Sequence, residues 1–492
     1  CISLEFVFKL KLNKLMQLYE GVRRSKFQSD DEAIISLYGS LKHKYKYSKL
    51  KYDLRKRLYN TLHLVELDSK LFDDDVKTFL ECQKAWTAIR FLIFFQAYQA
   101  AFSILEKYFP KMLNYEFTVM IVEGARLLRK YYSSFKLDVK KLNYYDNLIS
   151  EQLSLYAAEV TLDGYYNLLI SKYVEDKSPK EEVTKMATDY LDKIDLIYPK
   201  TLSSSFLSIY NLVKIIKYMS QYDYEKAVEV CNEAIEILQE RNVKRKLNLM
   251  LIYSQAINCH LQLRQYDLAE KKCVETFQYY LEEGEFNWFK TKELQLQNAI
   301  YSKSYQKAYA IYQESVNHKS FAKLSNSFKE EWRIYRAYLQ ILLLLDLVEP
   351  DVIQVEKTKF RLHKFLNEVA TFSKDKKGRN ITILVAQLVL FILQEQYNKV
   401  IDRMEAIEKY INRHLHNDYH HRTNFFVKII KELVKAGFES RMVQWNKIDE
   451  LKEALSQKPF NVINPNYDLE IIRYEQLVRF VTDFISVKKV YS

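Results

Sequence analysis

Glycine and proline are scarce in this sequence. It has 7 glycines and 6 prolines in 492 residues, and the glycine count is roughly a fifth of what an average usage of about 7% would give. Because glycine supplies most backbone positions with positive φ, this scarcity disfavours sheets with tight turns and glycine-rich phosphate loops, and it favours long helices with few breaks. No GxGxxG, GxxxxGKS/T, HExxH or GxSxG pattern occurs, so the usual sequence support for nucleotide or serine hydrolysis is missing. We therefore expect no enzymatic activity and no cofactor.

Cysteines and long apolar runs are also few. The five cysteines, Cys1, Cys82, Cys231, Cys259 and Cys273, form no CxxC pair and no framework spacing. We therefore expect reduced thiols in a cytoplasmic protein, without structural zinc or disulfides. No apolar run approaches the roughly 18 to 20 residues that cross a bilayer, so no contact with a membrane is expected.

The sequence begins without a methionine, and its first residues make a poor signal peptide because Lys9 and Lys11 interrupt the apolar patch. We expect residues 1–15 to be an upstream extension and Met16 to be the natural start. Mass spectrometry of the native amino terminus tests this expectation, which is wrong if residues 1–15 are found in place.

Aromatic and aliphatic residues are plentiful and follow a helical period. The sequence holds 39 tyrosines and 28 phenylalanines, and 48% of its residues are hydrophobic. Between the breaks, apolar residues recur at i, i+3, i+4 and i+7, and period-two alternation is not sustained anywhere, which predicts an all-α fold. The breaks divide the chain into a basic helical module at 16–66, helical repeats at 76–198, a second set of repeats at 206–456 and a terminal helix at 466–492.

Three stretches in the middle of the chain share one pattern, an aromatic residue three positions before an alanine. They are Tyr224–Ala227, Tyr266–Ala269 and Tyr305–Ala308, and their alanines are 269 − 227 = 42 and 308 − 269 = 39 residues apart. A weaker copy surrounds Val400, and Tyr98–Ala101 echoes the pattern in the amino-terminal half. A small residue lets two helices approach closely while the aromatic fills the wedge beside it. Each stretch is therefore predicted to be the second helix of a pair that stacks on its neighbours.

These stretches resemble the second helices of tetratricopeptide repeats, although the repeats are longer than usual and lack the family's glycine and closing proline. The resemblance implies a right-handed α-solenoid of antiparallel helix pairs whose first helices line a concave groove. It also implies a non-enzymatic scaffold that binds a peptide or helix of a partner protein in this groove. The groove positions carried over from the family are Ser254, Asn258, Gln262, Lys290, Glu293 and Gln297.

The excess of positive charge is concentrated at the amino end. Residues 1–60 hold 14 Lys and Arg against 6 Asp and Glu, a difference of 14 − 6 = 8 out of the chain's net charge of +12. Ser29 and Glu32 predict a capped helix that ends at Gly39, and Ser48 predicts the start of a second helix. The second helix has a predicted buried seam of Leu50, Leu54, Leu58 and Leu62, and its cations are Lys49, Lys51, Arg55, Lys56 and Arg57.

Two interpretations of this basic module remain open. Its second helix is either a solvated surface of a lysine-rich protein or the recognition helix of a helix-turn-helix that binds DNA. In the second case the chain would be a transcriptional regulator with the solenoid as its sensor or dimerisation domain. Only Arg55 and Asn60 are suited to contact base edges.

Two further features lie near the carboxyl end. His416 and His420 stand four residues apart and are a weak candidate for a metal site, and the alternative is an exposed helix end with chance histidines. The terminal segment has an apolar stripe, which predicts a helix that caps the stack. The stripe consists of Leu469, Ile472, Leu477, Phe480, Val481 and Phe484.

Overall fold

The computed structural model of the chain describes residues 14–24, 26–27, 29–62, 74–174, 180–241, 243, 246–349, 379–414, 421–458, 460 and 470–487. Within these ranges every regular element is a helix, which confirms the all-α prediction. The chain divides into two compact units, Cys1–Leu153 and Ser154–Ser492, and the division falls inside one long helix. None of the described helices is long and apolar enough to cross a membrane.

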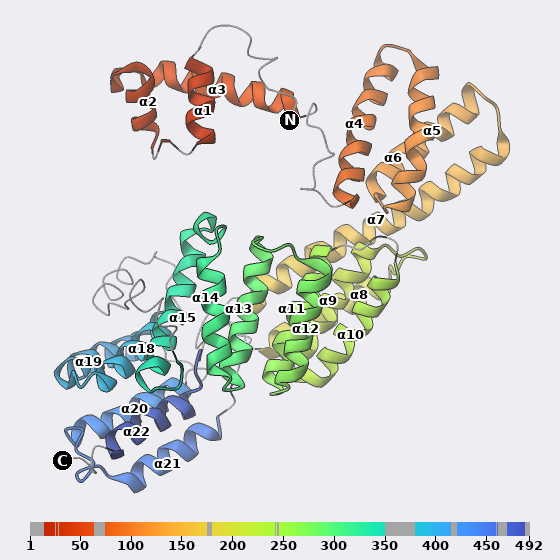
Figure 1. Cartoon of the computed structure of the whole chain (residues 1–492). Helices are drawn as coiled ribbons and strands as arrows, with labels where there is room; N and C mark the ends of the chain where they lie inside the picture. The colour runs from red at the N-terminus through yellow and green to blue at the C-terminus, as the bar shows by residue number, and fades with distance from the viewer. Residues whose placement is uncertain are drawn as a thin grey trace. The chain divides into compact units, whose positions relative to one another are not determined.

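The amino-terminal module packs three helices around a small core. They are α1 (Lys14–Arg23), α2 (Asp30–Tyr38) and α3 (Lys44–Thr61), drawn in red in Figure 1. Leu18, Ile34 and Leu54, one from each helix, are buried in this core. Both predicted ends of α2 are confirmed, because the Ser29 hydroxyl accepts an N–H from the first turn and Gly39 ends the helix with a φ of 74°.

The predicted start and seam of α3 are wrong in two places. The helix begins at Lys44, before Ser48, because a 3₁₀ turn, η2 (Leu41–His43), leads directly into it. Ser40 caps this turn, so no helix start is needed at Ser48. Leu62 is 62% exposed instead of buried, since α3 extends past the core that α1 and α2 provide (Figure 1).

The rest of the first unit is an antiparallel array of helices. It consists of α4 (Asp74–Phe94), α5 (Tyr98–Asn114), α6 (Thr118–Ser134) and the first part of α7 (Val139–Val174). Their shared core includes Leu105, Leu128 and Tyr132. As the repeat pattern predicts, α5 begins at Tyr98 and Ala101 is fully buried.

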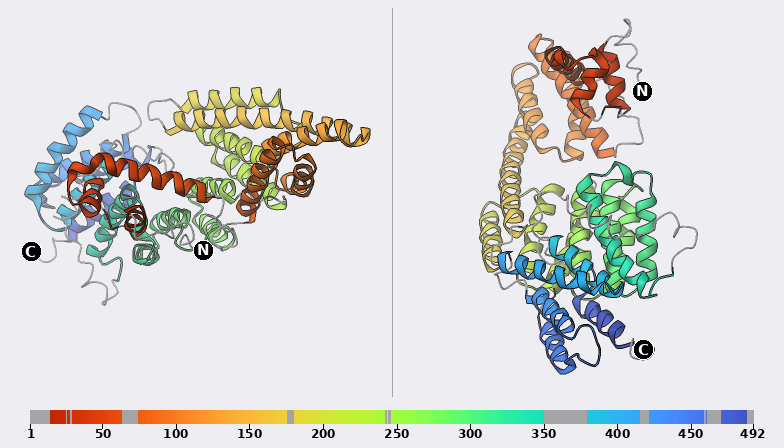
Figure 2. Two further views of the ribbon diagram at one scale, coloured as in Figure 1. Left: turned by 90° about the horizontal axis from the view of Figure 1, so that it is seen from above. Right: turned by 90° about the vertical axis from the view of Figure 1, so that its left-hand side faces the viewer.

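The second unit is a solenoid of helix pairs. After the second part of α7 its helices are α8 (Lys180–Asp195), α9 (Ser204–Ser220), α10 (Tyr224–Glu240), α11 (Lys246–Gln262), α12 (Tyr266–Tyr280), α13 (Phe286–Tyr301), α14 (Tyr305–Asn317), α15 (Asn326–Leu344), α18 (Arg379–Leu393), α19 (Tyr397–His414), α20 (His421–Lys435), α21 (Trp445–Ser456) and α22 (Tyr474–Val487), with a 3₁₀ turn, η4 (Phe321–Lys323), before α15. From α8 to α15 each helix packs against the next. Figures 1 and 2 show these helices standing side by side. The packing order confirms the predicted solenoid of helix pairs.

The repeated aromatic residue marks the start of the second helix in each pair. The helices α10, α12, α14 and α19 begin at Tyr224, Tyr266, Tyr305 and Tyr397. The small or short residues three positions later, Ala227, Ala269, Ala308 and Val400, are all fully buried. The outer face of α10 carries exposed glutamates, among them Glu225 and Glu229. The repeat pattern therefore predicted the second helices and the residues that they bury.

The turns within the pairs are tight although glycine is scarce. Each second helix is preceded by a non-glycine residue with positive φ, for example Tyr222 (61°), Arg264 (60°) and Lys303 (62°). The next residue donates its N–H to a carbonyl five residues earlier, as Ser304 does to Ala299 at 2.8 Å. This is the Schellman arrangement that ends a helix. The expectation that few glycines mean few breaks between helices is therefore wrong, because other residues adopt the left-handed conformation in these turns.

The predicted stripe is buried, although the terminal helix α22 begins only at Tyr474 and Ile472 precedes it. Ile472, Leu477 and Val481 are buried, and Phe480 and Phe484 are partly buried against the same core. α22 packs on α18, α20 and α21. Leu469, the first residue of the predicted stripe, lies outside the described residues.

Candidate peptide-binding groove

Three first helices, α11, α13 and α15, present polar side chains on neighbouring surfaces. On α13, Lys290, Glu293 and Gln297 follow one another at helical spacing and form one row. Lys290 Nζ lies 3.3 Å from a carboxylate oxygen of Glu331 on α15. Gln297 Oε1 accepts a hydrogen bond of 3.1 Å from the hydroxyl of Tyr335, also on α15. These contacts place the predicted groove positions of α13 beside α15.

The carboxyl-terminal part of the same chain occupies one half of this surface. At the end of α11, Gln262 Nε2 donates to the carbonyl oxygen of Phe460 at 2.5 Å. On α13, Gln297 Nε2 donates to the carbonyl oxygen of Ile471 at 3.0 Å. Two predicted groove residues therefore hold main-chain carbonyls, which is how a groove binds an extended chain largely independently of its side chains.

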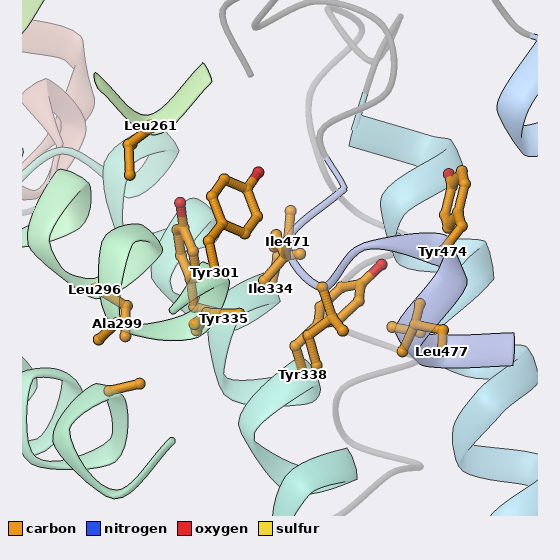
Figure 3. Close-up of a cluster of buried hydrophobic side chains, with 14 of the residues drawn as sticks. Leu261, Leu296, Ala299, Tyr301, Ile334, Tyr335, Tyr338, Ile471, Tyr474 and Leu477 are labelled. Carbon is orange, nitrogen blue, oxygen red and sulfur yellow. The ribbon is translucent and has the colours of Figure 1, made fainter. Parts of the chain in front are cut away.

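Aromatic side chains complete the contact around Ile471. The hydroxyl of Tyr301 donates to the carbonyl oxygen of Glu470 at 2.9 Å. Figure 3 shows Ile471 among the side chains of Tyr301, Ile334 and Tyr335, in one buried cluster. Because a buried hydroxyl without a partner is costly, the carbonyl of Glu470 is part of what allows Tyr301 to be buried there.

Arg473 contacts both Phe460 of this segment and the tyrosines of the solenoid. The guanidinium of Arg473 stands 4.5 Å from the ring centroid of Phe460 and 5.5 Å from that of Tyr301. Its Nη2 donates to the hydroxyl of Tyr266 on α12 at 3.0 Å. Cation–π contacts of this kind are worth about 0.5–2 kcal/mol, with the larger values at desolvated sites.

Arg422 and Glu470 form a buried ion pair at the start of this part of the segment. Arg422, on α20, donates from Nε to Glu470 at 2.5 Å and from Nη2 to Glu470 at 3.0 Å and to Glu475 at 2.7 Å. Its Nη1 donates to two carbonyl oxygens at the end of α21, at 3.1 and 3.0 Å. Glu470 also accepts the N–H of Tyr474 at the start of α22, at 2.8 Å. Burial raises the pKa of the Glu470 carboxyl to about 7, while the Arg422 guanidinium opposes this shift.

The other half of the predicted groove makes no described contact with this segment. Ser254 and Asn258 are half-buried on α11, and the Ser254 hydroxyl donates to a carbonyl of its own helix at 2.8 Å. Lys290 Nζ lies 3.1 Å from Glu293 and 3.3 Å from Glu331, whose side chains are 17% and 19% exposed. Two partly buried carboxylates, those of Glu293 and Glu331, therefore lie within 3.3 Å of one ammonium group.

The repeat pattern does not single out Tyr301 or Tyr335, which contribute as much to the occupied half as the predicted glutamines. Tyr301 follows Gln297 by one helical turn, so extending the row of groove positions would have found it. Tyr335 has no such signal, because no copy of the aromatic and alanine pattern follows α15 closely enough to set its register.

The predicted metal candidates, His416 and His420, lie outside the described residues. Among the residues that the structure does describe, no group of three or more His, Cys, Asp or Glu side chains is arranged to hold a metal ion. Cys82 and Cys231 are buried free thiols. Burial raises the pKa of Cys82 to about 11 and that of Cys231 well above its ordinary value. Neither thiol is therefore prepared for nucleophilic chemistry.

The five predicted nucleic-acid cations of α3 lie in different surroundings. Lys51 Nζ lies 2.6 Å from Asp30 on α2, so this lysine helps to hold the module together. Hydrogen bonds from Lys51 and Tyr47 lower the pKa of Asp30. The other four, Lys49, Arg55, Lys56 and Arg57, are exposed.

Comparison of the chain with protein-family models, with curated proteins and with solved structures gives no match. The function is therefore argued from the geometry of this chain alone.

Proposed function

We propose that this chain is a non-enzymatic interaction protein whose tetratricopeptide-like solenoid binds an extended segment of a partner protein along α11, α13 and α15. The observation that carries the proposal is the pair of hydrogen bonds from Gln262 and Gln297 to main-chain carbonyls of the chain's own segment. We propose that a second chain binds beside this segment, through polar side chains of the same row of first helices that the segment does not engage. A cytoplasmic location is part of the proposal, because the free thiols of the solenoid suit a reducing compartment.

The partner would bind in the half of the predicted groove where the described residues of the carboxyl-terminal segment make no contact. The carboxylates of Glu293 and Glu331 favour a partner segment with a lysine or arginine, which would share them with Lys290. The amide of Asn258, one turn before Gln262 on α11, is suited to a main-chain carbonyl of the partner.

A displayed library of twelve-residue peptides, selected on the full chain, tests this proposal. We expect selected peptides to be enriched in lysine or arginine and to bind with affinities that fall with salt. Glu293→Lys should weaken their binding by at least about tenfold, because it places a cation where the partner's cation would bind. Asn258→Arg should weaken binding by blocking the surface.

Glu229→Lys is the matched control, because Glu229 is exposed on the outer face of α10 and the substitution changes the charge by the same amount. If no peptide is selected above background, or if Glu229→Lys weakens binding as much as Glu293→Lys, the groove is not the binding surface.

A further inference from the structure

The face of α3 opposite the module core carries a row of alternating tyrosines and lysines. The row consists of Tyr45, Lys49, Tyr52, Lys56 and Tyr59, which recur every four and three residues. At about 3.6 residues per turn this spacing aligns all five along one line of the helix. The tyrosines are 83%, 63% and 62% exposed. We call this surface the tyrosine–lysine row.

The row does not pack against any described part of the chain. The opposite face of α3 packs into the module core, through Tyr47 and Leu54. Tyr45, Tyr52 and Tyr59 make no hydrogen bond or ring contact within the described residues. Three exposed aromatic rings in a line are typical of a surface that binds a partner. The sequence signal for them is their spacing of seven residues, which a search for cations alone does not detect.

The charge of the row restricts its partner. Lys49 and Lys56 lie in the row, and Arg55 and Asp53 flank it on opposite sides, so cations outnumber the single carboxylate along this face. The acidic side chains of α2 are already engaged, since Asp30 pairs with Lys51. A second copy of α3 is a poor partner, because two such rows packed together would bring four lysines together with only the two flanking Asp53 carboxylates to offset them. The partner is therefore anionic, and it also has to cover flat aromatic rings.

We propose that the tyrosine–lysine row binds single-stranded nucleic acid, with the three tyrosine rings stacked on unpaired bases and the cations on phosphates. Single strands offer both features at once, an anionic backbone and a free aromatic face on every base. A duplex offers only the backbone, since its bases are stacked on each other. The row also lacks the Arg, Asn and Gln residues that read base edges in a groove.

The dimensions of the row set the length of strand that it can hold. Tyrosines seven residues apart are separated by about 10.5 Å along the helix, at about 1.5 Å per residue. This distance equals about three base steps of roughly 3.4 Å. The whole row from Tyr45 to Tyr59 spans about 21 Å, which corresponds to a site of roughly six to nine nucleotides.

Fluorescence anisotropy with labelled 20-nucleotide single strands of DNA and RNA, titrated with the full chain at two salt concentrations, tests the proposal. Stacking on an aromatic side chain contributes about 1–3 kcal/mol per base, so each Tyr→Ala substitution in the row should raise the Kd about five- to hundredfold. The matched Tyr→Phe variants keep the ring and should bind nearly as well as the parent. Lys49→Gln together with Lys56→Gln should reduce the slope of log K against log salt by about 1.4, because two phosphate contacts are lost at about 0.7 each.

The controls are Tyr144→Ala and Lys136→Gln, both at exposed positions of the first unit outside α3, which should leave the Kd unchanged. Circular dichroism checks that each variant folds. Failure of the full chain to bind any single strand at low salt overturns the proposal. So does duplex binding as tight as single-strand binding and unaffected by Tyr→Ala, which would indicate contact with phosphates alone. Equal competition by poly-glutamate or by phosphatidylserine vesicles at matched charge also overturns it, because the row would then bind acidic proteins or anionic membranes.

Discussion

The Arg422–Glu470 pair makes a quantitative prediction about what holds the carboxyl-terminal segment in place. Arg422 is 7% exposed and Glu470 is 2% exposed, so both charges are almost completely removed from water. Replacing Arg422 by methionine keeps the apolar stem and removes all of the guanidinium hydrogen bonds. The Glu470 carboxylate then keeps the N–H of Tyr474 as its remaining hydrogen bond from the described chain.

The expected loss in Arg422→Met is about 3–5 kcal/mol at pH 8, the usual cost of leaving one charge of a buried pair without its partner. We expect it to be concentrated in α20 and α22, which the pair connects. Amide hydrogen exchange read by mass spectrometry measures it, because exchange reports the local opening free energy of each helix without requiring two-state unfolding of the whole chain.

The loss should depend on pH in a defined direction. In Arg422→Met the cation that opposes the burial of Glu470 is gone, so its folded pKa lies above the parent value of about 7 and well above the unfolded value of about 4.3. Between the unfolded and the folded pKa, the carboxyl carries a proton in the folded chain and none in the unfolded chain. Stability therefore increases as the pH falls from the folded pKa to the unfolded pKa. Between pH 8 and pH 7 the loss should shrink by up to about 1.4 kcal/mol per pH unit. Below pH 7 Glu470 of the parent also takes up its proton, so the loss should then stay constant.

Arg479→Met is the matched control. Arg479 lies on α22 as well, but its side chain is 75% exposed and pairs with Asp483 at 3.4 Å on the surface, so its loss should cost less than about 0.5 kcal/mol. Adding Glu470→Gln to Arg422→Met removes the uncompensated charge and should restore part of the stability. If Arg422→Met costs no more than Arg479→Met, or if its cost does not change between pH 8 and pH 6, the buried pair does not fasten the segment.

Three further predictions concern the turns, the thiols and the amino-terminal module. Lys303→Gly should raise the stability of the solenoid by about 0.5–1 kcal/mol in urea denaturation, because the left-handed backbone at φ 62° costs a non-glycine residue about 1–2 kcal/mol, more than the added chain entropy of glycine. Cys231 and Cys273 should not react with a thiol reagent at pH 8 until the chain is unfolded, because burial raises the pKa of both. Lys51→Met should destabilise the module by about 0.2–1 kcal/mol at pH 7. Since the pKa of Asp30 is lowered by Lys51, the difference should persist above the unfolded pKa and disappear as the pH falls through the folded one, in thermal melts followed by circular dichroism.

The helix pairs could be predicted from sequence because their signals are local. An aromatic residue and a small residue three positions apart decide where a second helix begins and which face is buried, as at Tyr224 and Ala227. The cap at Ser29 is equally local. The start of α3 was predicted wrongly at Ser48 for the same kind of reason, since a serine can cap a helix wherever one starts but does not require it to start there.

The occupation of the groove could not be predicted, because it joins residues that are far apart in the chain. Gln262 and Phe460 are separated by 198 residues, and Gln297 and Ile471 by 174. No periodicity connects a glutamine on a regular helix with a carbonyl in an irregular segment. The family resemblance supplied the positions of the donors, and only the folded chain supplies their acceptors.

The burial of the predicted groove residues explains why the carboxyl-terminal segment contacts them. In a solenoid groove that faces water, polar side chains at Gln297, Tyr301 and Tyr335 would be hydrated until a partner arrived. Here Gln297 is 4% exposed and both tyrosines are 3% exposed, and unpaired groups at that depth would cost about 1–3 kcal/mol each. The carbonyls of Glu470 and Ile471 remove this cost for Tyr301 and Gln297, while Tyr335 donates to Gln297. The segment before α22 therefore belongs to the fold and is not a ligand waiting to be displaced. A partner that binds the solenoid therefore has to bind beside this segment, at Asn258 and Glu293, where the side chains are only half-buried.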